Sequence, residues 1–449
     1  MKPISPIRRL ATVVTTLTVS VGILMVAAPA ALATPPDITA PGAVLIEMDT
    51  GRVLFDQNAH QPAYPASTTK IMTALLAIEH LDMDQVIPVP EDMGPANGAA
   101  MYLLPGESFT VRELVDSLMV KSANDAAVLL ARTISGSVES FAELMNQRAA
   151  ELGARNTHFT NPNGLPEDSH MTTPYDLAVI SRHAMQDPLF REIAAQVRVT
   201  LDETEQTPEK RYFRTSNRFM WSQALISYRD ELIPIKYDVV DGIKTGWTRQ
   251  ANQCLVSSGE VGGIRVIAVV LGAEGYNIYA DSRALLDYGF EHFEPYTLLA
   301  PGTVLGEMEI PGSIEGSIPY GVREEFTALR HRSDPDFFQY ETLLNPDPPE
   351  PPIRLGQVIG TLEVTDGDYR HIMNVHALGE AESVYAMVSA SSNVGNLGWQ
   401  VLRATLYGGG LLLLLFAAWF AWNVKKSGKR YRFRRRTKRT FIRPAKKHR

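Results

Sequence analysis

A serine and a lysine three residues apart lie in the stretch PASTTKIMT, residues 65 to 73, and this pair can do nucleophilic chemistry. Residues i and i+3 share one face of a helix, so the Lys70 amine can reach the Ser67 hydroxyl. A serine hydroxyl is a weak nucleophile until an adjacent base removes its proton. The spacing therefore predicts Ser67 as the nucleophile and Lys70 as its general base.

Lys70 can act as a base only in its neutral form. Its pKa must then fall from about 10.4 by roughly 3 units, which costs about 4 kcal/mol. Burial and a neighbouring cation both favour the neutral amine, and Lys244 is the candidate cation. The ordinary alternative is a helix-capping Ser67 with Lys70 on the surface. However, the expected helix is apolar over most of its surface, and an uncompensated lysine there would be unfavourable.

A second motif, Ser122-Ala123-Asn124, falls between two expected helices. We expect the Ser122 hydroxyl to carry a proton between a lysine amine and the leaving amine of a substrate. The Asn124 amide is expected to hold a lysine or a substrate amide, because it offers both donors and an acceptor. Taken alone, Asn124 would be better explained as the cap of the following helix.

The third motif, Lys244-Thr245-Gly246, lies on an expected strand. A positive charge beside a hydroxyl suits a substrate that ends in a free carboxylate. Gly246 leaves room for a substrate along the strand edge. The backbone N–H groups of Ser67 and Trp247 are the candidate oxyanion hole. Taken alone, Lys244 would be an ordinary solvated strand residue.

Hydrophobic periodicity indicates the elements that must position these motifs. Residues 42 to 58 alternate apolar and polar side chains, which predicts a β-hairpin. Thr110 and Glu113 form a capping-box pattern at a helix start, and Gly136 can end the next helix. Further helices are expected up to residue 152 and over 174 to 185, then antiparallel strands within 241 to 273, then a helix over 280 to 290. The body to about residue 293 is therefore an α/β mixture (α+β) whose first and last strands share a sheet.

The N-terminus has the pattern of an export signal. A basic region at residues 2 to 9 precedes an apolar region at 10 to 28 and a small-residue cleavage site, Ala31-Leu32-Ala33. Residues 1 to 33 are thus predicted to be a signal peptide, with an uncleaved anchor as the alternative. Export permits disulfides, but the single cysteine, Cys254, excludes an internal bridge, and we assign it no role.

Near the C-terminus, residues 405 to 424 form an uncharged apolar run, and we predict a transmembrane helix over 401 to 424. The remaining residues, 425 to 449, contain 14 Lys and Arg and no acidic residue. By the positive-inside rule this basic tail is cytoplasmic and the body lies outside, which predicts a single-pass cell-membrane protein. A nucleic-acid-binding tail is the disfavoured alternative, because basic clusters beside a membrane helix hold mainly to anionic headgroups.

Between the body and this helix, residues 294 to 400 contain short strand patterns and the proline-rich NPDPPEPP, followed by a lead-in to the membrane. These signals predict a second, smaller, β-rich domain. It has no cluster of a nucleophile with a base. A spacer or docking role is therefore preferred for it.

The three motifs in this order resemble those of the low-molecular-mass penicillin-binding proteins, the serine-type D-alanyl-D-alanine carboxypeptidases. The resemblance extends over residues 40 to about 390, with matching stretches that include PASTTKIMTALLAIE, KSANDAAVLLA, MNQRAAELGARNTHFTNPNGLPEDSH and DGIKTGWT. It implies a transpeptidase/β-lactamase-like domain, an antiparallel sheet flanked by helices, over residues 34 to 293. A β-rich domain on the membrane side is implied to follow.

Site roles also follow from the resemblance, residue by residue. Ser67 matches the acylated serine, Lys70 the general base, and Ser122 with Asn124 the middle motif, while Lys244 with Thr245 matches the substrate-carboxylate site. The implied reaction releases the terminal D-alanine of a peptidoglycan stem peptide through an acyl-enzyme, without metal or cofactor. Penicillins and other β-lactams are implied inhibitors that acylate the same serine.

Three alternatives to this function stay open. The first is a β-lactamase, which would need a deacylating glutamate, and no E-x-x-L-N pattern occurs between residues 122 and 244. The second is a DD-endopeptidase or transpeptidase of the same fold. The third is a catalytically silent, membrane-held protein that binds wall peptides. The chain also departs from the family pattern at Trp247, a variable position, and in its membrane-crossing anchor, where many members have an amphipathic helix.

Overall fold

The computed structural model describes residues 35–95, 97–333, 339–345, 349–366 and 369–434. The chain forms two compact units. The first holds the residues up to 300 with 324–341 and 363–372, and the second holds 301–323, 342–362 and the residues from 373 onward. The predicted signal peptide and the tail beyond residue 434 lie outside the described residues.

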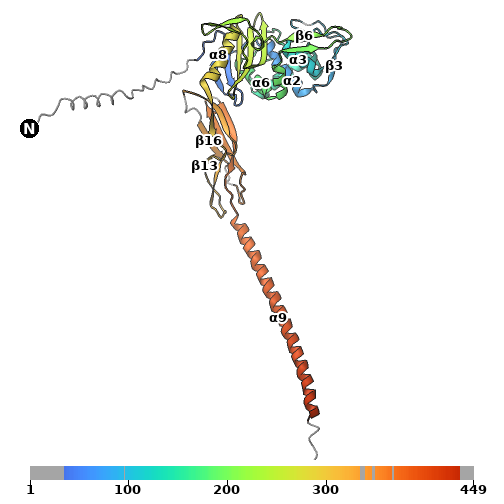
Figure 1. Ribbon diagram of the computed structural model, residues 1–449, viewed down its shortest axis with the longest axis vertical. Coiled ribbons are helices and arrows are strands. Elements are labelled where there is room, and N and C mark those ends of the chain that lie inside the picture. The colour runs from blue at the N-terminus through green and yellow to red at the C-terminus, as the bar shows by residue number, and fades with distance from the viewer. Residues whose placement is uncertain (1–34, 96, 334–338, 346–348, 367–368, 435–449) are drawn as a thin grey trace, which may run out of the picture. The chain divides into compact units, whose positions relative to one another are not determined.

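A five-stranded antiparallel sheet forms the centre of the first unit (Figure 1). Its order is β2-β1-β11-β10-β9, so the first hairpin pairs with a strand from the end of the unit, and Val44 lies opposite Val269. The prediction that the first and last strands share one sheet is therefore confirmed. The strands are β1 (Gly42–Glu47), β2 (Val53–Gln57), β9 (Val240–Thr248), β10 (Asn252–Val261) and β11 (Ile264–Ala273).

Helices cover both faces of this sheet. Successive residues of β11 from Val266 to Leu271 point into two different cores, which explains why this stretch is continuously apolar instead of alternating. Val269 packs in one core with Ile180 of α6 (Pro174–Gln186). Val270 packs in the other core with Leu285 of α8 (Asn277–His292). Both faces of the central part of the sheet are thus packed against helices.

The larger core also contains the helices that hold the first two motifs. Thr110 and Glu113 form the predicted capping box of α3, and Gly136 ends α4 in the left-handed conformation, with φ 80°. A short helix, α7, was not predicted; Asp187 caps it and a proline occupies its first turn. These helices are α2 (Lys70–His80), α3 (Val111–Val120), α4 (Asn124–Ser135), α5 (Val138–Leu152) and α7 (Pro188–Ala194).

Four short antiparallel pairs also belong to the first unit. They are β3 (Val86–Pro88) with β4 (Ser108–Thr110), β5 (Arg198–Leu201) with β6 (Arg211–Arg214), β7 (Leu225–Tyr228) with β8 (Glu231–Pro234), and β12 (Phe293–Leu299) with β15 (Phe326–His331). Three of them were not predicted, because strands of three or four residues are too short to show a period. The fourth, β12 with β15, lies where short strands were expected.

The second unit is built on another antiparallel sheet, of order β13-β14-β18-β17-β16, as the short strand patterns predicted. Residues 339–341, 363–366 and 369–372, which are the ends of β16, β17 and β18, belong to the first unit. The strands are β13 (Val304–Glu309), β14 (Ser317–Gly321), β16 (Gln339–Leu344), β17 (Val358–Asp366) and β18 (Tyr369–Ala377).

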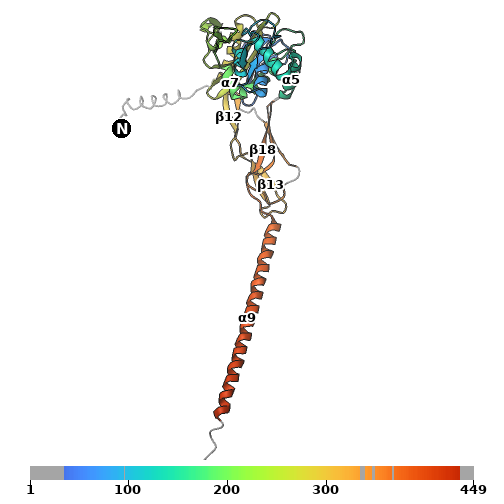
Figure 2. The ribbon, with the colours of Figure 1, turned by 90° about the vertical axis from the view of Figure 1, so that its right-hand side faces the viewer.

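A single long helix, α9 (Val384–Arg434), follows this sheet, and both Figure 1 and Figure 2 show it without interruption. Its stretch Gly398–Lys425 is long and apolar enough to cross a membrane, and it includes the predicted span 401–424. The expected lead-in at residues 391–400 is part of the same helix. The C-terminal helix is therefore a candidate membrane anchor.

Candidate active site

Ser67 and Lys70 meet where α2 begins. A single 3₁₀ turn, η2 (Ala66–Thr69), contains the serine, so the α-helix itself starts at Lys70. The Lys70 Nζ donates a hydrogen bond to Ser67 Oγ at 3.0 Å, and Lys70 is completely buried. Ala66 has φ 48°, an unfavourable value for a residue with a side chain. The backbone is thus strained immediately before the serine, as is common at active sites.

The loop of residues 157–173 supplies a second partner for Lys70. The backbone carbonyl of Asn163 accepts a hydrogen bond from Nζ at 2.6 Å. The next residue, Gly164, is pressed against the serine turn, because a Cβ placed on it would lie 1.8 Å from the Ala66 carbonyl oxygen. Its φ of +82° is also one that side chains rarely allow. Glycine is therefore required where this loop meets the serine.

Burial and a second cation act on the lysine amine, as its proposed chemistry demands. Burial lowers the pKa of Lys70 well below its usual value, the charge of Lys244 lowers it further, and Asp125 opposes the change. Burial also lowers the pKa of Lys244, to about 7. Burial and the charge of Lys244 therefore both favour the neutral form of Lys70 that a general base needs.

Ser122 and Asn124, near the start of α4, each have a buried side-chain atom without a hydrogen-bond partner in the described chain. These atoms are the Ser122 Oγ and the Asn124 Oδ1. Ser122 has φ 63°, again in the left-handed region. Ala123 is the N-cap of α4, so Asn124 is its first residue and does not cap it. Since buried polar atoms are normally paired, both atoms are available to a bound substrate.

The edge strand β9 brings the third motif to the serine. A Cβ placed on Gly246 would lie 2.9 Å from the Pro65 carbonyl oxygen and 3.0 Å from the Ser67 backbone nitrogen. The strand therefore runs directly beside the serine turn. Lys244 is buried and its Nζ donates to the Thr245 carbonyl at 2.9 Å. Trp247, by contrast, is 63% exposed.

The family model described as D-alanyl-D-alanine carboxypeptidase, peptidase S11, matches residues 29–275, more than half of the chain. The chain belongs to this D-alanyl-D-alanine carboxypeptidase family. The D-alanyl-D-alanine carboxypeptidase DacF of Bacillus subtilis is 33% identical over 329 residues, which cover 72% of this chain and 80% of that protein. The D-alanyl-D-alanine carboxypeptidase DacB2 of Mycobacterium tuberculosis is 37% identical over 263 residues, covering 57% of this chain and 84% of that protein.

A solved structure agrees with these relatives. Penicillin-binding protein 5 of Haemophilus influenzae superposes with a TM-score of 0.63 at 27% identity, over 78% of this chain and all of that chain. The predicted fold class and family are therefore confirmed. The protein is a serine-type D-Ala-D-Ala carboxypeptidase of peptidoglycan metabolism, because the serine mechanism is general to the family.

The structure brings the predicted residues of this carboxypeptidase together. Lys70 contacts Ser67 directly, Gly246 crowds the Ser67 nitrogen, and Lys244 is near enough for its charge to act on Lys70. Asp125, adjacent to Asn124, also acts on Lys70. The individual catalytic and binding roles of these residues remain predictions.

Four residues at this site were missed by sequence reasoning. The Asp125 carboxylate accepts from the backbone N–H groups of residues 101 and 103, both at 3.1 Å, and so holds the loop beside Asn124. The Ser216 hydroxyl hydrogen-bonds the Thr245 hydroxyl. Asn163 and His170 belong to the stretch TNPNGLPEDSH, which was noted only as part of the family resemblance. Its asparagine and glycine turn signals were the one available hint.

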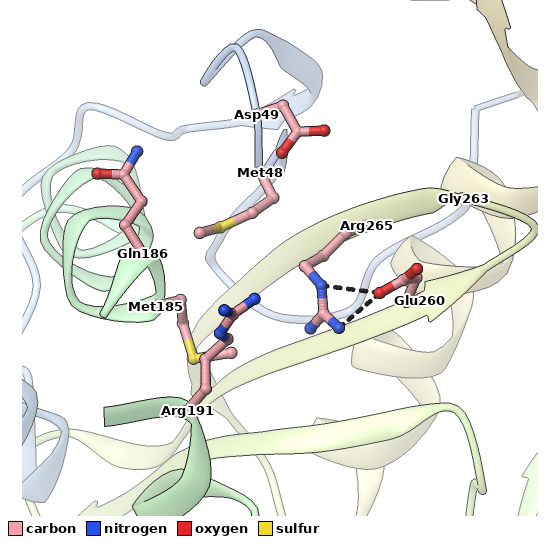
Figure 3. A pocket seen from close by; sticks show the side chains of 8 residues that line it. All are labelled: Met48, Asp49, Met185, Gln186, Arg191, Glu260, Gly263 and Arg265. Carbon is pink, nitrogen blue, oxygen red and sulfur yellow. Dashed lines mark hydrogen bonds and ion pairs between the residues drawn. The ribbon is translucent and has the colours of Figure 1, made fainter. Parts of the chain in front are cut away.

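The first unit also has a separate cavity (Figure 3). It is near the β10–β11 turn, where Arg265 pairs with Glu260 and the Arg191 side chain approaches from α7. No motif residue lines it. Glu260 is six residues along β10 from Cys254, the residue opposite Gly246, which amounts to about 20 Å. This cavity therefore takes no part in the chemistry at Ser67.

Within the described ranges, no group of three or more His, Cys, Asp or Glu side chains is arranged to hold a metal ion. Cys254 is buried and forms no disulfide, and burial raises the pKa of its thiol to about 12. A thiol with so high a pKa is a poor nucleophile at neutral pH. The serine is thus the stronger candidate nucleophile of this carboxypeptidase.

Proposed function

We propose that Ser67 is the residue acylated in this carboxypeptidase and that neutral Lys70 takes its proton. One observation carries the proposal: Lys70 Nζ is buried, 3.0 Å from Ser67 Oγ, and hydrogen-bonded to a backbone carbonyl at 2.6 Å. A carbonyl can only accept, so it takes one N–H of the amine. The amine lone pair is then left for the serine hydroxyl.

In the proposed reaction Ser67 Oγ attacks the carbonyl carbon between the last two D-alanines of a peptidoglycan stem peptide. The backbone N–H groups of Ser67 and Trp247 stabilise the oxyanion. Ser122 then passes the proton to the leaving nitrogen, the C–N bond breaks, and D-alanine departs. Water hydrolyses the ester and restores the serine. The unpaired Oγ of Ser122 is free to make this transfer.

Substrate recognition is proposed to rest on Lys244 and Thr245 for the terminal carboxylate and on Asn124 for a substrate amide. Gly246 leaves the edge of β9 open for the peptide backbone. β-Lactams carry an amide and a carboxylate in the same relation, so they are proposed to acylate Ser67 as well. The protein needs no cofactor in this scheme.

We also propose where the parts of the chain lie. Residues 34–293 are the catalytic domain and 294–400 the β-rich domain with the membrane lead-in, both outside the cell membrane. Residues 401–424 cross it, and the basic tail 425–449 is cytoplasmic. The apolar stretch Gly398–Lys425 and the 14 basic residues that follow residue 424 support this orientation.

The proposal is tested by D-alanine release from a peptide ending in D-Ala-D-Ala, using the full-length protein in detergent. Ser67→Ala is expected to abolish release, because it removes the hydroxyl that is proposed to be acylated. Its fold should be unchanged, since only one hydroxyl is lost. Release by the Ser67→Ala variant at a rate comparable to that of the unmodified protein would refute the assigned mechanism.

A further inference from the structure

His170 contacts Thr69, the last residue of the serine turn, and has a single possible tautomer. The ring is 1% exposed, and its Nδ1 accepts a hydrogen bond from the Thr160 backbone N–H at 3.0 Å. An amide N–H can only donate, so Nδ1 carries no proton and the ring hydrogen is on Nε2. Nε2 then donates to the Thr69 hydroxyl, 2.9 Å away. The imidazole is therefore a bridge with one donor and one acceptor.

The two ends of this bridge are the two segments that hold Lys70. Thr69 is the residue directly before Lys70 in the chain. Thr160 starts the stretch of loop that ends in Asn163, whose carbonyl accepts from the lysine amine. A second bond joins the same segments: the Thr73 hydroxyl donates to the Pro162 carbonyl at 2.6 Å.

We propose that His170 is a positioning residue for acylation: it fixes the distance between the catalytic turn and the loop that binds the Lys70 amine. This inference rests on the proposed role of Lys70 as the base. If the loop moved away, the Asn163 carbonyl would no longer orient the amine lone pair toward Ser67. Water would also reach an amine whose low pKa depends chiefly on burial.

The surroundings of His170 keep it neutral, as the bridge requires. Phe159 packs against the ring, with the centroids 5.7 Å apart, and the neighbouring basic groups are His158 and Lys70. Burial first, and then any positive charge on His158 or Lys70, lowers the pKa of His170 to about 4. A protonated ring would place a second N–H against the Thr160 N–H and break that hydrogen bond. Burial therefore favours the neutral ring that the bridge requires.

Two substitutions break opposite ends of the bridge. In His170→Gln the amide can still donate to Thr69, but the acceptor for Thr160 is lost. In Thr69→Val the acceptor for Nε2 is lost in a side chain of nearly the same shape. His80→Gln is the matched control, because His80 is an exposed histidine on the same helix as Lys70.

The measurement is the second-order rate constant for acylation of the full-length protein by a fluorescent penicillin, followed from pH 4 to pH 10. Both bridge variants are expected to shift the acid limb upward by about one pH unit, and so to react about tenfold more slowly on that limb, because the Lys70 pKa rises. The control should match the unmodified protein. A purely structural role would lower the labelled fraction and leave the rate constant and the limb unchanged.

Bridge variants with a rate constant within twofold of the unmodified protein and an unmoved acid limb would overturn the inference. That result would leave the proposed function intact if the unmodified protein is still labelled at Ser67. By contrast, absence of label at Ser67 in the unmodified protein would overturn the proposed function itself. The two failures are therefore distinguishable in one set of experiments.

Discussion

Lys244→Met is expected to stabilise the fold at neutral pH while damaging catalysis. The pKa of Lys244 is lowered from its ordinary 10.5 to about 7 by burial. Between these two pH values the unfolded chain therefore binds nearly one proton more than the folded chain at this residue, so stability rises with pH. At 1.36 kcal/mol per pKa unit, the unmodified protein gains about 4 kcal/mol from pH 7 to pH 10.5, which a methionine variant does not.

The assay is urea denaturation of both proteins at pH 7 and pH 10.5. The stability advantage of Lys244→Met at pH 7 should shrink by about 4 kcal/mol at pH 10.5. Lys236→Met is the control, because Lys236 is half-exposed and makes only a surface ion pair with Asp238. A pH-independent difference between Lys244→Met and the unmodified protein would refute the reasoning.

The same variant should lose activity preferentially on peptides with a free C-terminal carboxylate. Removing this cation also removes one cause of the low pKa of Lys70, so the acid limb of acylation should move to higher pH. The sign follows from the base form: a lysine with a higher pKa is protonated at pH values where it was previously neutral. An equal loss of rate on amidated and free peptides would contradict the carboxylate role.

Two further substitutions test the crowding at the serine turn and the proton transfer. Gly164→Ala is expected to prevent acylation, because its Cβ would lie 1.8 Å from the Ala66 carbonyl oxygen. The control is Gly136→Ala, which is also at positive φ but has no atom within 4 Å of the added Cβ, and this variant should be acylated normally. Equal acylation of the two variants would contradict the argument. Ser122→Ala is expected to slow D-alanine release by about 10²-fold or more without lowering the melting temperature, since its Oγ makes no hydrogen bond; a large fall in melting temperature would contradict this.

Much of the fold could be predicted from local signals. The capping box at Thr110 and the C-terminal Gly136 are short-range patterns whose hydrogen bonds lie within one turn, so the sequence displays them directly. The short hairpins were missed because strands as brief as β7 and β8 give too few residues for a period to be seen. α7 was missed because its seven residues are shorter than a recognisable helical repeat.

At the site, side chains were easier to predict than backbone groups. Ser67, Lys70 and Lys244 were found because their types and order are unusual together. The Asn163 carbonyl could not be found, because every residue has a carbonyl and only the fold places this one at the lysine. His170 was missed for a related reason: its partners are the Thr69 hydroxyl and the backbone N–H and hydroxyl of Thr160, and residue spacing along the chain does not reveal these contacts.

The most direct test of the account locates the acylated residue. The full-length protein is incubated with a labelled penicillin, digested, and examined by mass spectrometry, and free D-alanine is quantified in parallel with a peptide ending in D-Ala-D-Ala. The account predicts one label per chain, on Ser67, together with D-alanine release that the penicillin blocks. Label on any other residue, or D-alanine release that continues after Ser67 is fully labelled, would contradict it.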